Sequence, residues 1–260
     1  MHIQLGLVPT IVVSSPKTIE KVLKTYDHVF ASRPHHEASQ HVCYGQRNLI
    51  FSKYGSYWRN MRKLTTMNLL SSQKINSYQP SRKEEVSLLV KSIKHVADHD
   101  QEHVVAVDLS AKVSSLNANL SCLMVFGKKF MDEDLDKRGF KYLVQEVVHL
   151  AATPNLGDFF PYLGVLDLQG ITSRLKALSK VFDEFLEKII DEHVESKEQR
   201  ETKDFVDTMM DIMQSGEAGF EFDRRHVKAV LLDMLMASMD TSATSVEWIL
   251  TECYEPNVTW

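Results

Sequence analysis

The chain has 260 residues and a formal net charge of −5, from 30 Lys and Arg against 35 Asp and Glu. A hydrophobic content of 43 % excludes a disordered or collagen-like chain. The mild acidity argues against a nucleic-acid binder, which usually carries a strongly basic surface. The three cysteines are far apart in the sequence, so no disulfide framework is expected, and no apolar run predicts a transmembrane helix.

The first 15 residues predict two short strands, with a turn at Val8-Pro9 between them. Ser15-Pro16 then predicts the start of a helix. Residues 27–55 are rich in His, Arg and Gly, and we expect them to be irregular.

From Ser56 onward, apolar residues recur at three- and four-residue steps, which predicts helices. The expected helices begin at Ser56 and then cover about 77–96, 108–126, 136–152, 171–196, 205–213 and 223–252. A connector with several Gly and Pro residues is expected at 153–170. In the helix over 77–96, the residues expected to face inward are Val86, Leu89, Val90 and Ile93.

The last predicted helix is apolar nearly all round between Val230 and Met239, which is typical of a helix in a core. Asp240 and Thr241 follow in its middle. Burying a carboxylate is costly unless it is paired or solvated. The pattern therefore leaves two interpretations open: a chemical role for Asp240, or a helix that reaches solvent at this turn.

Trp58 and Arg62 are four residues apart on a predicted helix, so they share a face. With Arg59 and Lys63 nearby, that face suits an anionic group such as a carboxylate. The alternative is a core Trp beside solvated basic residues, and the spacing alone favours this alternative.

Two patterns that resemble metal sites do not meet the requirements, and no metal site is predicted. His36 and His41 are five residues apart, which places them about 140° apart around a helix. The acidic run Asp132–Asp136 lacks the Gly and Glu that a calcium loop needs at its sixth and twelfth positions.

Four segments together carry a more specific signal: Phe30–Pro34, Tyr54–Lys63, Asn155–Gly170 and Ala237–Ser242. In this order and spacing they resemble plant cytochrome P450 monooxygenases of the family 71 type, over about residues 1–252. The resemblance implies a mainly α fold, the N-terminal portion of the P450 fold with a short N-terminal β-hairpin. Residues 1–252 would form a partial domain and residues 253–260 a divergent tail.

The resemblance also implies haem as cofactor, with Trp58 and Arg62 binding a propionate. Residues 237–242 would form the oxygen-binding segment, where Thr241 hydrogen-bonds dioxygen, Asp240 helps to deliver protons and Ala237 lies at the cofactor. A Thr hydroxyl can also bond the carbonyl four residues back and bend the helix. Ser238 stands where the family prefers Gly, and its hydroxymethyl group is expected to narrow the oxygen groove.

Residues 35–52 would belong to a substrate-recognition loop, and Leu231–Ala237 would line the substrate pocket. The implied activity inserts one atom of dioxygen into a small organic substrate of the plant secondary-metabolite type. Electrons would come from NADPH through a P450 reductase. The family resides on the endoplasmic reticulum membrane; the sequence shows no anchor, so a cytoplasmic location is the alternative.

The family's haem-ligand pattern, Phe-x-x-Gly-x-Arg-x-Cys, does not occur in this sequence, and Cys253 lacks the Gly-rich turn that would let it substitute. Because P450 iron needs a Cys thiolate, we expect the chain as given to be inactive. The alternative hypothesis is a non-catalytic helical remnant or a partner-binding fragment, in which residues 227–239 expose an apolar face.

Overall fold

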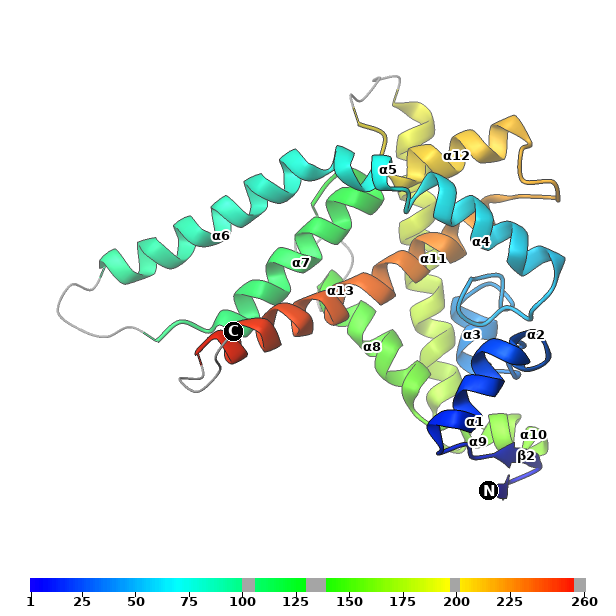
Figure 1. Ribbon diagram of the computed structural model, residues 1–260. Helices are drawn as coiled ribbons and strands as arrows, with labels where there is room; N and C mark the ends of the chain where they lie inside the picture. Colours follow the sequence, from blue (N-terminus) through cyan, green and yellow to red (C-terminus); the bar gives the residue numbers. More distant parts are fainter. Residues whose placement is uncertain (100–105, 130–138, 197–201, 255–260) are drawn as a thin grey trace.

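The protein is described from a computed structural model, which covers residues 1–99, 106–129, 139–196 and 202–254. This part of the chain is mainly helical and contains a two-stranded sheet, as the sequence predicts (Figure 1). The elements of the N-terminal part are β1 (His2–Leu5), β2 (Val8–Ile11), α1 (Pro16–Glu20), the π-helical turn η1 (Lys21–Thr25), α2 (Asp27–Phe30), α3 (Glu37–Val42), α4 (Ser56–Asn68) and α5 (Ser72–Ser77). The later helices are α6 (Gln79–His99), α7 (Leu109–Phe126), α8 (Phe140–Ala152), α9 (Leu156–Phe159), α10 (Pro161–Gly164), α11 (Ile171–Glu195), α12 (Phe205–Ser215) and α13 (Arg224–Tyr254).

The long helices lie where the periodicity of apolar residues predicts them. The structure differs from the prediction in several short helices. Helices α2 and α3 occupy the segment expected to be irregular, and α9 and α10 occupy the expected connector. The backbone N–H of Glu37, at the start of α3, donates to Asp158 Oδ1 at 2.8 Å. This cap comes from a residue 121 positions away, so local sequence does not reveal it. The expected starting region of α8 at 136–138, and the acidic run 132–136, lie outside the described residues.

The turn of the β-hairpin lies at Gly6-Leu7 and not at Val8-Pro9, which corrects the prediction. Gly6 has φ +60°, and a Cβ at this position would lie 2.5 Å from the carbonyl oxygen of Phe159. Leu7 N–H donates to the same carbonyl at 2.8 Å. Pro9 instead lies in β2 opposite Gln4, where an edge strand tolerates the missing N–H.

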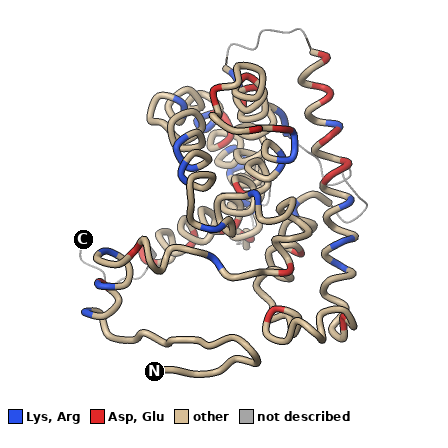
Figure 2. Tube along the Cα trace, turned by 90° about the vertical axis from the view of Figure 1, so that its right-hand side faces the viewer, with Lys and Arg blue, Asp and Glu red and all other residues tan. Residues whose placement is uncertain are grey.

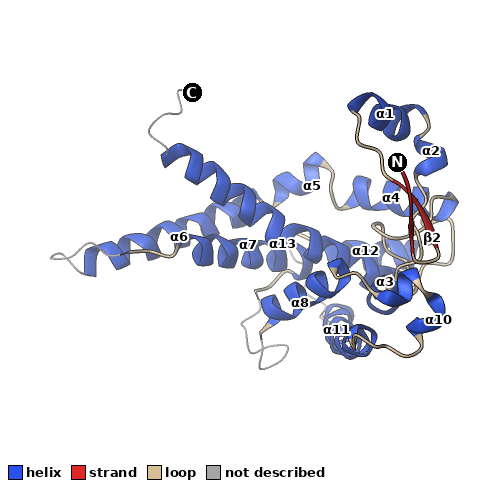
Figure 3. Cartoon of the chain, turned by 90° about the horizontal axis from the view of Figure 1, so that it is seen from below, coloured by secondary structure: helices blue, strands red, loops and turns tan. Residues whose placement is uncertain are grey.

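Helix α13 crosses the middle of the molecule and packs along α7, and α6 lies on the other side of α7 (Figures 1 and 3). Helix α11 packs against α3, α8 and α12. The largest side chains of the shared core are almost fully buried: Phe126, Phe182, Met61, Leu175, Leu186, Met209 and Leu231. Basic and acidic residues are interspersed along the chain in the view of Figure 2.

Two expectations about burial are wrong. The apolar segment 227–239 is covered by this chain itself, with Val227, Val230 and Leu231 each 0 % exposed. Val86 and Val90 of α6 are exposed instead of facing inward, because α6 packs chiefly on α7. In α13 the exposed apolar side chains come later, at Val246, Trp248 and Ile249. The helix continues to Tyr254, across the expected domain boundary at residue 252, which stays a prediction.

Candidate functional site

The turn 237–241 of α13 is the first part of the candidate site. Thr241 Oγ1 donates a hydrogen bond to the carbonyl oxygen of Ala237 at 2.6 Å, the contact expected from their spacing. Both residues are exposed. Because Ala237 has only a methyl side chain, the exposed outer face of this turn carries little side-chain bulk.

Asp240 lies on the same turn and is partly exposed. Its Oδ1 accepts a hydrogen bond from Nε2 of Gln145 on α8 at 3.1 Å. Helix α13 therefore reaches the surface at this turn, which was one of the two interpretations of the sequence. The carboxylate is solvated and bonded to an amide, so it is not an isolated buried charge.

Helix α7 holds this turn from the inner side through residues that the sequence did not single out. Asn117 Nδ2 donates to the carbonyl oxygens of Ser238 at 2.6 Å and of Met239 at 2.5 Å. The hydroxyl of Ser121 lies 2.8 Å from the hydroxyl of Ser238. The Ser238 hydroxyl is thus directed at Ser121 of α7, and the expectation that it narrows an oxygen groove stays a prediction.

Three successive carbonyls of α13 therefore accept side-chain donors: that of Ala237 from Thr241, and those of Ser238 and Met239 from Asn117. Side-chain donors that compete for helical carbonyls loosen or bend a helix locally. The turn is thus bonded to α7 on its inner side, and its outer face is exposed.

The second part of the site is the pair on α4. The Arg62 guanidinium carbon lies 5.1 Å from the centroid of the Trp58 ring, so the two predicted residues do share a face. Arg62 is exposed and has no carboxylate partner among the described residues. The indole N–H of Trp58 donates to the carbonyl oxygen of Leu49 at 3.0 Å. Arg62 is therefore available for an anion, whereas the Trp58 donor is already bonded within the chain.

A buried carboxylate that the sequence analysis passed over lies two turns before Asp240. Asp233 is 1 % exposed. It accepts from Asn48 Nδ2 at 2.7 Å and from the backbone N–H of Leu49 at 2.6 Å. Burial raises the pKa of Asp233 to about 6, and these hydrogen bonds offset only part of that effect. The signal available in the sequence was an Asp inside an otherwise apolar helix.

The structure brings Trp58 together with Arg62, and Ala237 together with Thr241. Within the described residues no hydrogen bond or ring contact joins the two pairs directly. Leu49 provides the indirect connection, since its N–H bonds Asp233 of α13 and its carbonyl bonds Trp58 of α4.

A cluster of possible metal ligands lies elsewhere, at the start of α12. His193, Asp204 and Asp207 have ligand atoms within 4.8 Å of one another. His193 Nε2 lies 2.8 Å from Asp204 Oδ2, and the two aspartates each accept the other's backbone N–H in a capping box. These bonds explain the cluster as the cap of α12.

The two histidines that resemble a zinc motif are used separately. His41 bonds Glu37 at 3.0 Å, and His36 bonds the carbonyl oxygen of Ala151 at 3.0 Å and stacks on Phe51.

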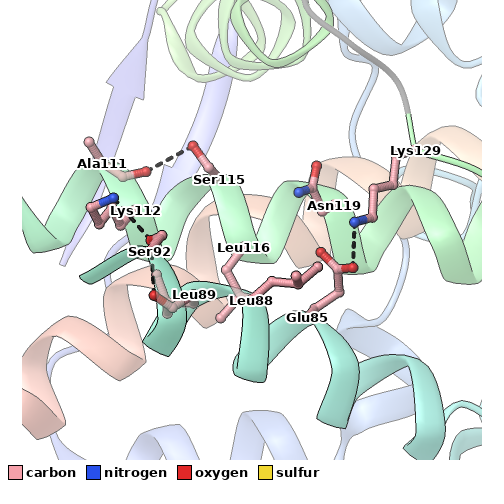
Figure 4. Close-up of a pocket in the computed structure, with 10 residues that line it drawn as sticks. All are labelled: Glu85, Leu88, Leu89, Ser92, Ala111, Lys112, Ser115, Leu116, Asn119 and Lys129. Atoms are coloured by element: carbon pink, nitrogen blue, oxygen red, sulfur yellow. Dashed lines mark hydrogen bonds and ion pairs between the residues drawn. The ribbon is translucent and has the colours of Figure 1, made fainter. Parts of the chain in front are cut away.

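A cavity of about 370 Å³ lies between α6 and α7, with leucines as its apolar part (Figure 4). Its charged groups are bonded within the chain: Glu85 pairs with Lys129 at 2.5 Å, and Lys112 donates to Ser92 at 3.1 Å. None of the five predicted site residues lines this cavity. Of the helices described, none combines the length and the apolar character needed to cross a membrane.

Comparison with known proteins identifies the family of this chain. The family model described as Cytochrome P450 matches residues 1–258. The chain is 41 % identical over 258 residues to cytochrome P450 CYP736A12 of Panax ginseng, a match that covers 97 % of this chain and 50 % of the relative. It is 35 % identical over 256 residues to cytochrome P450 71A1 of Persea americana, a match that covers 96 % of this chain and 50 % of the relative. A relative from Arabidopsis thaliana, named indoleacetaldoxime dehydratase, is 30 % identical over 253 residues, 97 % of this chain and 50 % of the relative.

Among solved structures, that of a zebrafish cytochrome P450 with progesterone matches with a TM-score of 0.71 at 21 % identity, over 96 % of this chain and 55 % of that chain. This likeness shows the fold. The chain spans about half the length of the curated relatives that it matches. The match of the family model along nearly the whole chain shows that this protein belongs to the cytochrome P450 family.

Proposed function

We propose that this chain forms the oxygen-activating and propionate-binding part of a haem monooxygenase that acts on a small organic substrate. The observation that carries the proposal is the turn 237–241 of α13. Its inner carbonyls are held by Asn117, and its outer face, with Ala237 and Thr241, is small and exposed. Such a face suits the approach of a flat macrocycle.

The residues present fit part of a haem site. Arg62 is an exposed cation without a carboxylate partner in the described chain, and it is stacked on Trp58, so it can take an anionic propionate. Trp58 would have to exchange its bond to Leu49 for one to the propionate. Arg62 is therefore the principal propionate contact in this proposal, with Trp58 as the surface that orients it.

Haem, when bound and supplied with electrons from NADPH through a reductase, supplies the chemistry that inserts one oxygen atom into an organic substrate. The chain's own contribution is to place donors. The Thr241 hydroxyl donates to Ala237 in this structure and can rotate to donate to a ligand above the turn. The Asp240 carboxylate beside it is partly solvated, so it can take up a proton from water and pass it on.

The described cysteines do not provide a thiolate for the iron. Cys43 and Cys122 are each 2 % exposed, and burial raises the pKa of the Cys43 thiol well above its usual range. Cys253 is exposed near the end of α13, without a Gly-rich turn before it. We therefore propose that none of these three cysteines is the axial ligand. The absence of a thiolate-type spectrum from the reduced, CO-treated chain of 260 residues is the expected result.

Two further expectations belong to the same proposal. The electron donor would be an NADPH-dependent reductase, and the site of action would be the endoplasmic reticulum membrane. Membership of the family and the similarity to plant relatives support both expectations.

The proposal is tested by titrating the purified chain with haemin and following the Soret absorbance. Arg62→Ala should weaken haemin binding about tenfold, because a charge-assisted contact to a carboxylate contributes on the order of 1.5 kcal/mol or more. Arg59→Ala is the matched control. Arg59 lies on the same helix, is exposed, and stacks on Tyr54 at 5.5 Å. Equal losses in the two variants would refute a specific role for Arg62.

A further inference from the structure

The loop before α4 has an unfavourable backbone that needs support. Tyr44, Gly45 and Gln46 follow one another with φ of 52°, 77° and 59°. Two of these residues are not glycine, and the left-handed region costs such residues free energy. The residues that follow, 47–52, which we call the 47–52 loop, must therefore be held in place by contacts from elsewhere.

Asp233 supplies the contacts from α13. One carboxylate oxygen accepts from Asn48 Nδ2 at 2.7 Å and the other accepts from the N–H of Leu49 at 2.6 Å. Asn48 is 0 % exposed. Its own Oδ1 accepts from the N–H of Phe51 at 3.3 Å, and its carbonyl accepts from Ser52 Oγ at 2.5 Å. The carboxylate thus binds the residue around which the 47–52 loop folds.

The same loop is bonded to α4 on its other side. The indole N–H of Trp58 donates to the carbonyl oxygen of Leu49 at 3.0 Å, and the Tyr57 hydroxyl donates to the carbonyl oxygen of Arg47 at 2.5 Å. The peptide groups of Leu49 therefore lie between Asp233 and Trp58. The Trp58 ring in turn supports the Arg62 guanidinium at 5.1 Å.

We infer that Asp233 is a positioning residue: by holding Asn48 and Leu49 it fixes the orientation of the Trp58 indole, and with it the Arg62 guanidinium above that ring. The functional meaning of this arrangement rests on the proposed function, in which Arg62, oriented by the Trp58 ring, binds a propionate. The contacts on which the inference depends all lie within this chain and involve no bound ligand.

A carboxylate suits this position better than its amide analogue. Asp233 accepts with both oxygens, from one side-chain amide and one backbone amide. Asn at the same position has a single acceptor, and its NH₂ group would face one of two donors. Asp233→Asn therefore preserves shape while it replaces one acceptor oxygen by a donor, and so removes a contact to the loop.

The test uses the indole N–H signals of the ¹⁵N-labelled chain of 260 residues. The sequence contains three Trp, at 58, 248 and 260, and Trp58→Phe identifies the Trp58 signal. In Asp233→Asn this signal should shift, and its hydrogen exchange should accelerate about tenfold, as expected for a lost or weakened hydrogen bond. Trp248 is 64 % exposed on the same helix, and its signal should not move.

Asp240→Asn is the matched control, since it makes the same chemical change two turns further along α13. It should leave the Trp58 signal in place. If Asp233→Asn disrupts the whole fold, which a collapse of the Trp248 signal would reveal, Asn48→Ala provides the second variant. It removes one of the two donors to Asp233 and should shift the Trp58 signal in the same direction.

An unmoved Trp58 signal in a folded Asp233→Asn or Asn48→Ala chain would overturn the inference. The proposed function fails separately, through the haemin titration. If Arg62→Ala leaves haemin affinity unchanged while Asp233→Asn moves the Trp58 signal, then Asp233 positions the pair but the pair does not bind haem.

Discussion

The two halves of α13 differ sharply in their surroundings although both are rich in apolar residues. In the first half, Val227, Leu231 and Leu235 are 0 % exposed, enclosed by the neighbouring helices. In the second half, Val246, Trp248 and Ile249 are 40 to 64 % exposed. Ala237 and Thr241 lie at the boundary between the buried half and the exposed half of α13.

The two aspartates of α13 show the consequence of this difference. Asp233 and Asp240 are seven residues apart, so they lie near the same side of the helix. Asp233 is enclosed and anchors a loop, whereas Asp240 is at the surface and bonded to Gln145. The role of each carboxylate is thus decided by the segment that covers it and not by its neighbours in the helix.

The largest difference between the two halves of α13 should appear in the free energy of unfolding when an apolar side chain is truncated in each. Leu231→Ala should lower the free energy of unfolding by about 3 to 5 kcal/mol, because it leaves a cavity in a fully packed region. Ile249→Ala, in the exposed half, should cost less than about 1 kcal/mol. Urea unfolding followed by circular dichroism measures both. Similar losses at the two sites would contradict the difference in burial.

The second largest effect should be a pH dependence of stability that comes from the buried Asp233. The folded pKa of Asp233 is raised to about 6 from an ordinary value of 3.8. Between these values the folded state keeps a proton that the unfolded state has released, so stability falls as pH rises through this window. At roughly 1.4 kcal/mol per pH unit, the full loss is up to about 3 kcal/mol.

The comparison with Asp233→Asn isolates this contribution, since the variant cannot titrate at this position. The stability of the natural chain relative to the variant should be larger at pH 4 than at pH 7. Burial raises the pKa of Cys43 and of Tyr57, and the neighbouring Asp233 raises both further, so these two groups stay neutral between pH 4 and pH 7. A stability difference that is constant between pH 4 and pH 7 would refute the raised pKa.

Most of the helical architecture was predictable from the sequence, because it depends on short-range periodicity. The helices over 56–68, 171–195 and 224–254 follow the spacing of their apolar residues. The hydrogen bond from Thr241 to Ala237 was also predictable, since it joins residues one turn apart. The stacking of Arg62 on Trp58 follows from their four-residue spacing.

The contacts between distant segments were not predictable in the same way. Asp233 bonds residues 185 and 184 positions away, and Asn117 bonds carbonyls 121 and 122 positions away. No local pattern encodes such pairs. The apolar face at 227–239 was expected to be exposed because the later half of the family's fold was expected to cover it; α7, α8 and α12 of this chain cover it instead.

The smallest expected effect concerns the turn between the two halves. Asn117→Ala removes the donor to the carbonyls of Ser238 and Met239 and should lower the free energy of unfolding by about 1 to 2 kcal/mol. Helical geometry assigns these two carbonyls to the backbone N–H groups of Ser242 and Ala243, four residues on.

Without competition from Asn117, these two amides should bond more tightly and exchange with solvent more slowly, even though the chain as a whole is less stable. Hydrogen exchange measured by NMR separates the local effect from the global one. Ser115→Ala is the matched control on α7, since its hydroxyl donates to the carbonyl oxygen of Ala111 within the same helix and to no residue of α13 that the structure describes. A general acceleration of exchange that includes Ser242 and Ala243 would show that Asn117 merely stabilises the fold. Slower exchange at these two amides alone would show that α7 holds the turn 237–241 of α13 in a loosened form.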